Sequence, residues 1–193
     1  MKFIRTEIED VVVVEPKVWG DERGYFVETF RKDLFEDFLG FEVGFCQDNE
    51  SKSKRAVLRG LHYQLPPFAQ SKLVRVIEGS VLDVAVDIRK GSPTFGKYVA
   101  VELSGENKRQ LFVPRGFAHA FVVTSETAIF AYKVDNYYAP EYDRGIRFDD
   151  PDISLKLPFG ADELLVSPKD AALPSLQDAD LFDYNDELYG DSK

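Results

Sequence analysis

Short apolar runs separated by turn residues dominate the chain, and many of them alternate between hydrophobic and polar positions. Such runs, rich in Val, Ile, Phe and Tyr, are typical of β-strands. The pattern predicts strands at residues 11–19, 25–30, 56–65, 72–79, 80–88, 98–103, 109–114, 118–124 and 127–135. Many short strands with turns between them favour a sandwich or a barrel over a sheet of alternating strands and helices.

One turn is especially clear in the sequence. The alternating runs 72–79 and 80–88 meet at Glu78-Gly79-Ser80. Two alternating runs around a short glycine-containing turn predict a β-hairpin.

Two segments depart from the strand pattern. Residues 31–40 carry four apolar side chains on one helical stripe and end in Gly40, which predicts one short helix. Residues 175–193 contain six carboxylates and a single basic residue, Lys193. We expect this acidic tail to be a surface strap or a partly disordered end without a function of its own.

The chain of 193 residues contains no internal repeat and no linker. Its length suits one domain, and we expect residues 1–193 to form it, with 175–193 as the acidic C-terminal tail.

Composition excludes several classes of protein. The 24 Lys and Arg residues against 34 Asp and Glu give a net charge of −10, which argues against nucleic-acid binding through a basic surface. Cys46 is the only cysteine, so the chain can build neither a disulfide framework nor a Cys-zinc site. The first residues resemble neither a signal peptide nor a membrane span. Together these features predict a protein of the cytoplasm that does not associate with membranes.

The two histidines of the chain, His62 and His119, are its most informative polar residues. Strand alternation places His119 on an apolar face, and Tyr132 points inward by the same argument. These side chains could line a pocket or could be satisfied polar groups of the core. Strict alternation puts Arg59 and His62 on opposite faces, and a β-bulge at Gly60 would bring them together.

The spacing around the histidines resembles that of the cupin fold. Pro114, Gly116 and His119 match the P-x-G-x-x-H signature of the second cupin motif. In the first motif, which supplies metal ligands in other cupins, this chain has Gln64 in place of a histidine and Lys72 in place of a glutamate. An ammonium group repels a metal ion, so the sequence predicts a metal-free cupin. A lysine in a partly dry pocket can instead stabilise an anion that forms on a substrate.

The remaining candidates suit proton transfer. A histidine can act as a general base near neutral pH, and a buried tyrosine can act as an acid. A carboxylate on the far nitrogen of His62 would fix its tautomer. Asp170, in the segment Ser167-Pro168-Lys169-Asp170, is one of many carboxylates that could serve.

Six sequence blocks in register resemble the dTDP-4-dehydrorhamnose 3,5-epimerase family, a metal-free branch of the cupins. The resemblance extends over residues 1 to about 175. It implies an all-β fold, a cupin or jelly-roll β-barrel with a few short helices and a C-terminal strap. The blocks are Asp21–Phe26, Gln47–Asn49, Leu58–Gln64, Lys72–Val76, Val113–His119 and Ser167–Asp170.

The resemblance also implies a reaction. The family's substrate, dTDP-4-dehydro-6-deoxy-D-glucose, has a ketone at carbon 4 that acidifies the hydrogens on carbons 3 and 5. The family inverts both carbons through enolates without a cofactor, and it feeds dTDP-L-rhamnose synthesis. By resemblance His62 is the base, Asp170 its partner, Lys72 the group beside the enolate oxygen, and Tyr132 the acid on the opposite face.

The resemblance further implies a substrate-binding set and a homodimer that exchanges an N-terminal strand between subunits. Tyr138 would stack on the thymine, and position 143, often Glu in the family, is Asp here. The implied binding residues are Arg23, Glu28, Gln47, Asn49, Arg59, His119, Tyr138, Asp143 and Lys169.

Other functions remain open at this point. The chain could invert only carbon 3 or only carbon 5, or move the carbonyl of a dTDP-4-keto-6-deoxy sugar as a ketoisomerase. It could also be a non-catalytic nucleotide-sugar-binding cupin, although a binder needs neither a base nor an acid. A metal-dependent cupin enzyme would be recognised by metal analysis of the purified protein.

Overall fold

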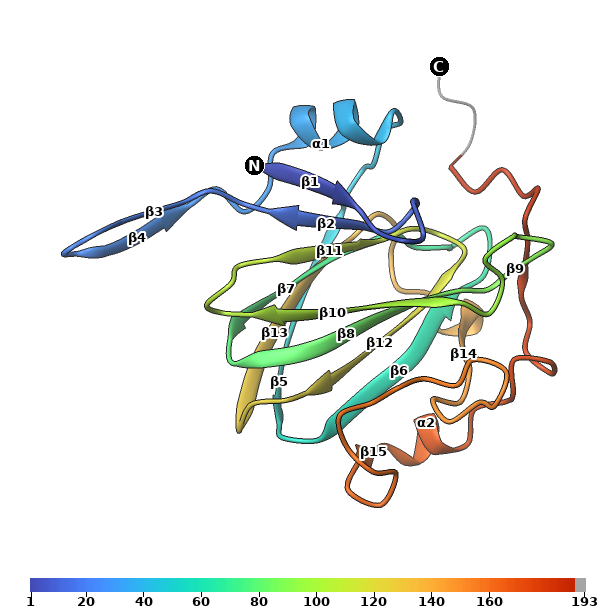
Figure 1. Cartoon of the computed structure of the whole chain (residues 1–193). Coiled ribbons are helices and arrows are strands. Elements are labelled where there is room, and N and C mark those ends of the chain that lie inside the picture. The colour runs from blue at the N-terminus through green and yellow to red at the C-terminus, as the bar shows by residue number, and fades with distance from the viewer. Residues whose placement is uncertain (190–193) are drawn as a thin grey trace.

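The computed structural model describes residues 1–189 of the chain, and two β-sheets packed face to face form its centre (Figure 1). The first sheet has the strand order β1-β2-β11-β7-β13-β5. Its strands are β1 (Lys2–Arg5), β2 (Val12–Glu15), β11 (Gln110–Val113), β7 (Lys72–Glu78), β13 (Thr127–Val134) and β5 (Gln47–Lys54).

The second sheet has the order β10-β8-β12-β6-β14, with β15 beside β6. Its strands are β10 (Tyr98–Ser104), β8 (Ser80–Asp87), β12 (Phe117–Val123), β6 (Val57–Gln64), β14 (Asp143–Gly145) and β15 (Leu165–Val166). Within residues 1–189, no ladder of hydrogen bonds joins the two sheets at their edges, so the jelly roll is a sandwich.

Smaller elements complete the described chain. Two strand pairs stand apart from the main sheets, β3 (Val18–Asp21) with β4 (Gly24–Val27), and β9 (Arg89–Lys90) with β16 (Phe182–Asp183). The helices are α1 (Lys32–Leu39), α2 (Pro168–Ala171) and the 3₁₀-turn η1 (Pro140–Tyr142).

Three apolar layers hold the sandwich together, because both sheets are covered on both faces. The layer between the sheets consists mainly of Val, Leu and Phe side chains from β2, β7, β8 and β10–β13. Phe35 of α1 packs on the outer face of the first sheet against Phe112. C-terminal side chains such as Ile153, Leu176 and Phe182 cover the outer face of the second sheet.

The all-β jelly-roll prediction is confirmed, as is the short helix. Helix α1 lies within the predicted range 31–40, and Gly40 ends it with a left-handed φ of 82°. Each predicted strand range overlaps an observed strand, and five short strands and one long one were not predicted. The long one is β5, whose sequence QDNESKSK contains no apolar residue.

The predicted hairpin at Glu78-Gly79-Ser80 is wrong. Strand β7 pairs with β11 and β13 in the first sheet, whereas β8 pairs with β10 and β12 in the second. The turn is therefore a corner between the sheets. Gly79 has φ of 78°, and a Cβ there would lie 2.0 Å from the carbonyl oxygen of Thr127, so a glycine is required for the close approach. Alternation along the two runs does not reveal this corner. Every second side chain of each run is buried between the sheets whether the two strands pair with each other or belong to different sheets.

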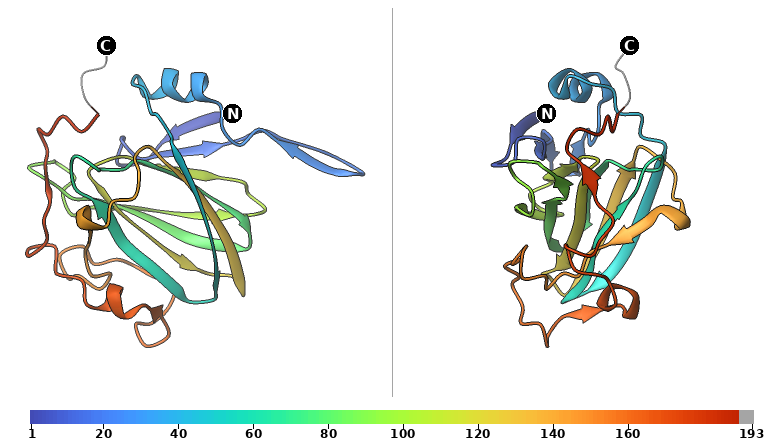
Figure 2. Two further views of the ribbon diagram at one scale, coloured as in Figure 1. Left: turned by 180° about the vertical axis from the view of Figure 1, so that it is seen from behind. Right: turned by 90° about the vertical axis from the view of Figure 1, so that its right-hand side faces the viewer.

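The strap predicted at the C-terminus is confirmed for residues 175–189, and residues 190–193 lie outside the described part. The segment runs along one side of the molecule (red in Figure 2) and pairs in parallel with β9 through β16. Phe182 is only 2% exposed, so this segment is packed and not a disordered end.

The β3–β4 hairpin extends away from the sandwich as a two-stranded ribbon (Figures 1 and 2). Its aromatic side chains Trp19, Tyr25 and Phe26 are exposed. A two-stranded ribbon with apolar side chains in water is marginally stable by itself.

Candidate active site

Seven of the candidate residues line one cavity of about 430 Å³ between the two sheets. The first sheet contributes Lys72 from β7 and Tyr132 from β13. The second sheet and α2 contribute the other five, which are Arg59, His62, His119, Lys169 and Asp170.

A β-bulge at Gly60 brings Arg59 and His62 to the same cavity. His119 pairs with His62, but Phe121 pairs with Arg59, so β6 has one more residue than β12 over this stretch. Gly60 has φ of 124°, and its Cβ would lie 2.5 Å from Ala120. The predicted bulge is therefore confirmed, and only glycine fits it.

His62 and Asp170 form a hydrogen-bonded pair. Nε2 of His62 lies 2.7 Å from Oδ1 of Asp170, and the Gly60 N–H donates to Oδ2 at 3.4 Å. Helix α2 positions the carboxylate, because the Ser167 hydroxyl caps the helix by accepting the Asp170 N–H. Burial raises the pKa of Asp170, but the hydrogen bonds from His62 and Gly60 outweigh burial and hold the pKa below its ordinary value. Asp170 is therefore an anion that fixes the ring of His62.

The Lys72 amine lies next to this pair and donates a hydrogen bond to the carbonyl oxygen of His62 at 3.3 Å. Burial lowers the pKa of Lys72 to about 8, while the charges of Asp143 and Asp83 act in the opposite direction. At neutral pH the amine is thus mostly an ammonium group, in a site where little water screens its charge.

Tyr132 comes from the sheet opposite to the one that carries His62, and both side chains line the cavity. Its ring packs near Phe130, with 6.0 Å between the ring centroids. Burial raises the pKa of Tyr132, and the Arg59 guanidinium partly offsets the effect. The phenol is therefore protonated at neutral pH and can donate a proton.

His119 forms a second buried pair, with Asp83 of β8. Nε2 of His119 lies 3.0 Å from both carboxylate oxygens. Burial lowers the pKa of His119 and raises that of Asp83. The hydrogen bonds fix the orientation of the ring against the cavity.

A smaller cavity of about 280 Å³ shares His62, Lys72 and Tyr132 with the first. The Gln47 side chain donates to Asn49 at 2.9 Å, and Gln47 also accepts the Tyr138 N–H at 3.3 Å. The candidate residues that line this smaller cavity and not the first are Gln47, Asn49, Tyr138 and Asp143.

An ion pair joins the lining of the first cavity to that of the smaller one. Lys169 lies 2.5 Å from Asp143, and the Tyr138 hydroxyl donates to the same carboxylate at 3.4 Å. The hydrogen bond from Lys169 joins α2 to β14, and it raises the pKa of Lys169.

The fold does not bring Arg23 and Glu28 to either cavity. Arg23 lies at the turn of the β3–β4 hairpin, where its side chain is 85% exposed and pairs with Asp21. Glu28 follows directly after β4.

Sequence reasoning missed several residues that support the site. Ser53 accepts a hydrogen bond from Arg59 at 3.2 Å, and Ser167 caps α2. Asp83 could have been found, since an acidic residue stands on the inward face of an otherwise apolar run. Ser167 could have been found as well, because a serine followed by a proline and, two residues later, by an aspartate is typical of a helix N-cap. Ser53 carries no comparable signal in the sequence.

Gln64, at the position of a metal ligand in other cupins, serves the loop that carries Tyr138. Its amide donates to the carbonyl oxygens of Phe68 and Tyr137 and accepts the Ala139 N–H at 2.8 Å. Within residues 1–189, no group of three or more His, Cys, Asp or Glu side chains is arranged to hold a metal ion. In the same part of the chain, no helix is long and apolar enough to cross a membrane.

The fold and the site define a class, a cupin-type jelly roll whose cavity is lined by a histidine–aspartate pair, a half-buried lysine and a tyrosine. A family model described as dTDP-4-dehydrorhamnose 3,5-epimerase matches residues 5–178. The chain belongs to this family.

Individual relatives agree with the family model. The chain is 55% identical over 182 residues to a dTDP-4-dehydrorhamnose 3,5-epimerase from Shigella flexneri, a match that covers 94% of this chain and 99% of the relative. It is also similar to the crystal structure of dTDP-6-deoxy-D-glucose-3,5-epimerase RmlC from Legionella pneumophila in complex with dTDP-4-keto-L-rhamnose. That likeness has a TM-score of 0.92 and 49% identity, and it covers 96% of this chain and 99% of the other.

The similarity to an epimerase of one carbon is lower. A 3'-monoepimerase from Streptomyces bikiniensis, solved with dTDP-quinovose, has a TM-score of 0.83 and 34% identity and covers 89% of this chain and 86% of the other. The difference in identity favours the relatives that act on two carbons.

Proposed function

We propose that the chain inverts carbons 3 and 5 of dTDP-4-dehydro-6-deoxy-D-glucose and forms dTDP-4-dehydro-L-rhamnose, with no cofactor. The observation that supports this proposal best is the placement of His62 with Asp170, the Lys72 amine and the Tyr132 phenol around one cavity. A protein that only binds a sugar nucleotide needs no such set of a base, a cation and an acid.

In the first step His62 removes the proton from the carbon next to the ketone. Because Nε2 already contacts Asp170, Nδ1 is the nitrogen that takes the proton. The electrons of the C–H bond move to the ketone oxygen, which becomes an enolate. The Asp170 anion stabilises the imidazolium, and the Lys72 ammonium stabilises the enolate oxygen.

In the second step a proton returns to the same carbon from the opposite face. Tyr132 is suited to this step because its phenol belongs to the opposite sheet. The nearby Arg59 charge, which lowers the pKa of Tyr132 against the effect of burial, stabilises the tyrosinate that forms. Before the second carbon reacts, the His62 imidazolium releases its proton to solvent and the Tyr132 tyrosinate takes one from solvent. Inversion of the second carbon then repeats the two steps.

The other candidates would bind the nucleotide and the sugar. Arg59, His119 and Lys169 lie on the same cavity as the reacting groups, and the cations among them suit a diphosphate. The smaller cavity offers Tyr138 for the thymine, with Gln47, Asn49 and Asp143 beside it. This local group of cations lets an anionic nucleotide bind a chain of net charge −10, because screening limits the global field to about 10 Å.

Deuterium incorporation tests the proposal. The protein is incubated with the keto sugar nucleotide in deuterated water, and a reductase traps the product for NMR analysis. We expect deuterium at both carbons. Deuterium at one carbon would identify a single-position epimerase, and exchange at neither carbon would refute the proposed reaction.

We further propose that two copies of the chain exchange their β3–β4 hairpins in a homodimer. The hairpin leaves its own sandwich, exposes Trp19, Tyr25 and Phe26, and holds Arg23 outside its own cavities. A second copy would cover the aromatic side chains and receive Arg23 and Glu28 at its site. The single Cys46 and a nucleotide-activated substrate support a cytoplasmic location for this dimer.

Mixing two inactive variants tests the exchange. In a mixed dimer of Arg23→Ala and His62→Ala subunits, one site would have both intact residues and the other neither. If Arg23 acts across the dimer, random mixing restores about one quarter of the wild-type activity. If Arg23 acts within its own subunit, the mixture stays inactive, and a monomer in analytical ultracentrifugation would equally refute the exchange.

A further inference from the structure

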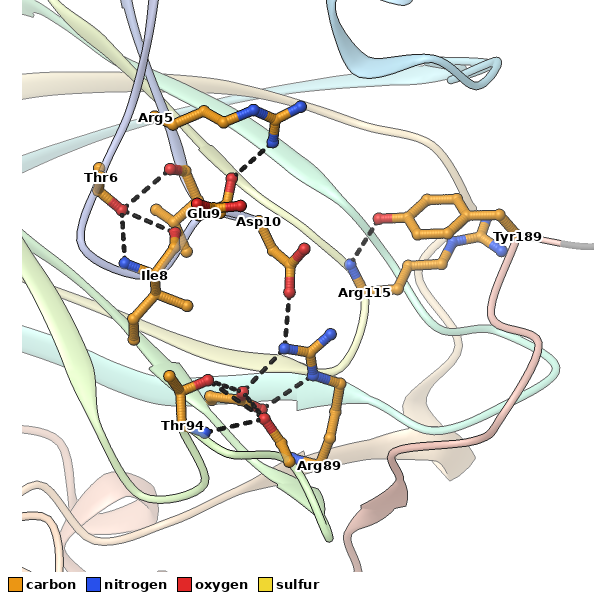
Figure 3. Close-up of polar contacts among 12 residues, drawn as sticks. Arg5, Thr6, Ile8, Glu9, Asp10, Arg89, Thr94, Arg115 and Tyr189 are labelled. Atoms are coloured by element: carbon orange, nitrogen blue, oxygen red, sulfur yellow. Dashed lines mark hydrogen bonds and ion pairs between the residues drawn. The ribbon is translucent and has the colours of Figure 1, made fainter.

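Two of the places at which the C-terminal strap is attached to the sandwich lie in its last eight described residues. At the first, β16 pairs with β9, Phe182 enters the core, and the ring of Tyr184 lies 5.2 Å from the Arg89 guanidinium. Arg89 itself forms ion pairs with the buried Asp87 and with the exposed Asp10, and Figure 3 labels Arg89 and Asp10. These contacts hold the strap as far as Tyr184, five residues before its last described residue.

The second attachment is Tyr189, which lies beyond the family match that ends at residue 178. Its hydroxyl accepts the Arg115 N–H at 2.9 Å (Figure 3) and shares a hydrogen bond of 2.8 Å with the Ser71 hydroxyl. Its ring packs on Phe41, with 4.4 Å between the centroids. Burial raises the pKa of Tyr189 to about 12, so the hydroxyl keeps its proton for Ser71 at neutral pH.

Arg115 and Asp135 complete a closed polar network around this hydroxyl. The Arg115 side chain donates to the Leu188 carbonyl oxygen at 2.6 Å and to Asp135 at 3.1 Å. Asp135 in turn accepts the Ser71 N–H at 2.6 Å. The network thus joins the strap to Ser71 both directly and through Asp135.

The positions of Ser71 and Asp135 give the network its significance. Ser71 directly precedes Lys72, the first residue of β7, and Asp135 directly follows Val134, the last residue of β13. Val134 and Lys72 are paired across the two strands. The network therefore joins the ends of the strands that carry the Lys72 amine and the Tyr132 phenol.

We infer that Tyr189 is a positioning residue that holds the Lys72 end of β7 and the adjoining end of β13 in the geometry the reaction needs. The inference rests on the proposed function for its kinetic consequence. Its structural consequence, a Lys72 amine held where burial lowers its pKa, does not depend on that function.

Two variants remove the same hydrogen bond from its two ends. Tyr189→Phe keeps the ring on Phe41 and loses the hydroxyl, and Ser71→Ala removes the other partner. Tyr184→Phe is the matched control, because its ring is exposed on the same strap at the other attachment. Tyr189→Phe also loses the hydrogen bond from the Arg115 N–H, so its effect should be at least as large as that of Ser71→Ala. The double variant Tyr189→Phe/Ser71→Ala should be no worse than Tyr189→Phe alone, since Tyr189→Phe already lacks the bond to Ser71.

The first measurement is the pKa of the Lys72 amine by NMR of ¹³C-labelled lysine, with the signal assigned through Lys72→Arg. The amine now has a pKa of about 8, against 10.5 for an exposed lysine. When the strand end loosens, water reaches the amine, and we expect the pKa to rise by about half a unit or more in both variants. The groups that face the amine from the packed strands remain in place, namely His62, Asp83, His119, Tyr132 and Asp143.

The second measurement is the rate of epimerisation. We expect kcat to fall about three- to tenfold, with KM within about twofold, because the network holds the strand ends that carry Lys72 and Tyr132 and has no hydrogen bond to the residues proposed to bind the nucleotide. An unchanged Lys72 pKa in Tyr189→Phe and Ser71→Ala overturns the inference, even if both variants melt earlier than the wild type. Equal shifts in the Tyr184→Phe control would also overturn it. If the wild type epimerises nothing, the proposed function is refuted, and the lysine titration still decides the inference.

Discussion

Replacing Asp170 by asparagine tests the base directly, because the two side chains share a shape and differ in charge. In the wild type Oδ1 contacts Nε2 of His62 at 2.7 Å, and Oδ2 accepts the Gly60 N–H at 3.4 Å. Only an oxygen can meet the Gly60 N–H, so the variant turns its NH₂ group toward His62. Nε2 must then accept a hydrogen bond, and the ring proton moves to Nδ1, the nitrogen that should remove the substrate proton.

The magnitude follows from two losses. A hydrogen bond to a charged group contributes about 1.5–3 kcal/mol, which corresponds to about a 10- to 150-fold fall in rate when the imidazolium loses it. The wrong tautomer blocks proton removal in addition. We therefore expect kcat to fall at least about hundredfold, while KM changes little because Asp170 is 4% exposed and sits behind His62.

Deuterium exchange at carbons 3 and 5, followed by NMR, measures this effect on both carbons separately. Asp149→Asn is the matched control, since Asp149 is an exposed carboxylate paired with Arg147 and should retain full activity. A kcat of Asp170→Asn within about threefold of the wild type would refute the assignment of His62 as the base oriented by Asp170.

Three further changes test the other parts of the site. Tyr132→Phe should slow inversion more than deuterium exchange, because His62 can still form the enolate; equal losses in the two assays would remove Tyr132 as the acid. Lys72→Met should abolish deuterium exchange yet raise the melting temperature at pH 7, since burial opposes the charge of Lys72. A gain of about 1 kcal/mol in the free energy of unfolding corresponds to a rise of about 2–4 °C. The pKa of Lys72 is about 8 in the folded chain and 10.5 in the unfolded chain, so unfolded chains bind more protons between pH 8 and 10.5 and the wild type gains stability as the pH rises through this range. The difference in stability between Lys72→Met and the wild type should therefore shrink there. A difference that stays constant would contradict burial of the charge as its cause. Gly60→Ala should lower the free energy of unfolding, measured by urea titration, by about 2–4 kcal/mol, because its φ of 124° and the 2.5 Å approach to Ala120 leave no room for a Cβ. The control Gly44→Ala, whose Cβ would have no atom within 4 Å, should be neutral. Similar values for both variants would exclude strain at the bulge.

Alternation of apolar and polar residues was sufficient to predict the inner faces of the central strands. It placed His119 and Tyr132 toward the interior, and the structure has both on the cavity. It failed at the corner after β7, because the strands on both sides of Gly79 bury the same face whether they pair with each other or with different partners. Which partner a strand takes depends on contacts distant in sequence, and periodicity contains no information on them.

Strand β5 shows a second limit of the same reasoning. Its eight residues are all polar, yet it pairs with β13 along its whole length. A strand at the edge of a sheet needs hydrogen bonds from its backbone more than burial of its side chains. Asn49 and Ser51 of this strand line the cavities. A strand that a hydropathy pattern does not predict can therefore still contribute residues to the site.

The acidic tail shows why composition misjudged the C-terminus. Most residues after 175 are acidic or exposed, and their average describes a segment that belongs in water. The contacts that hold the strap depend on single residues placed several positions apart, such as Leu176, Phe182 and Tyr189. Their acidic neighbours can face solvent while these side chains are buried, so a mean over the segment hides the few positions that decide whether it packs. A segment of this kind can therefore reach as far as Ser71, at the start of the strand that carries Lys72, without a hydrophobic pattern that would predict it.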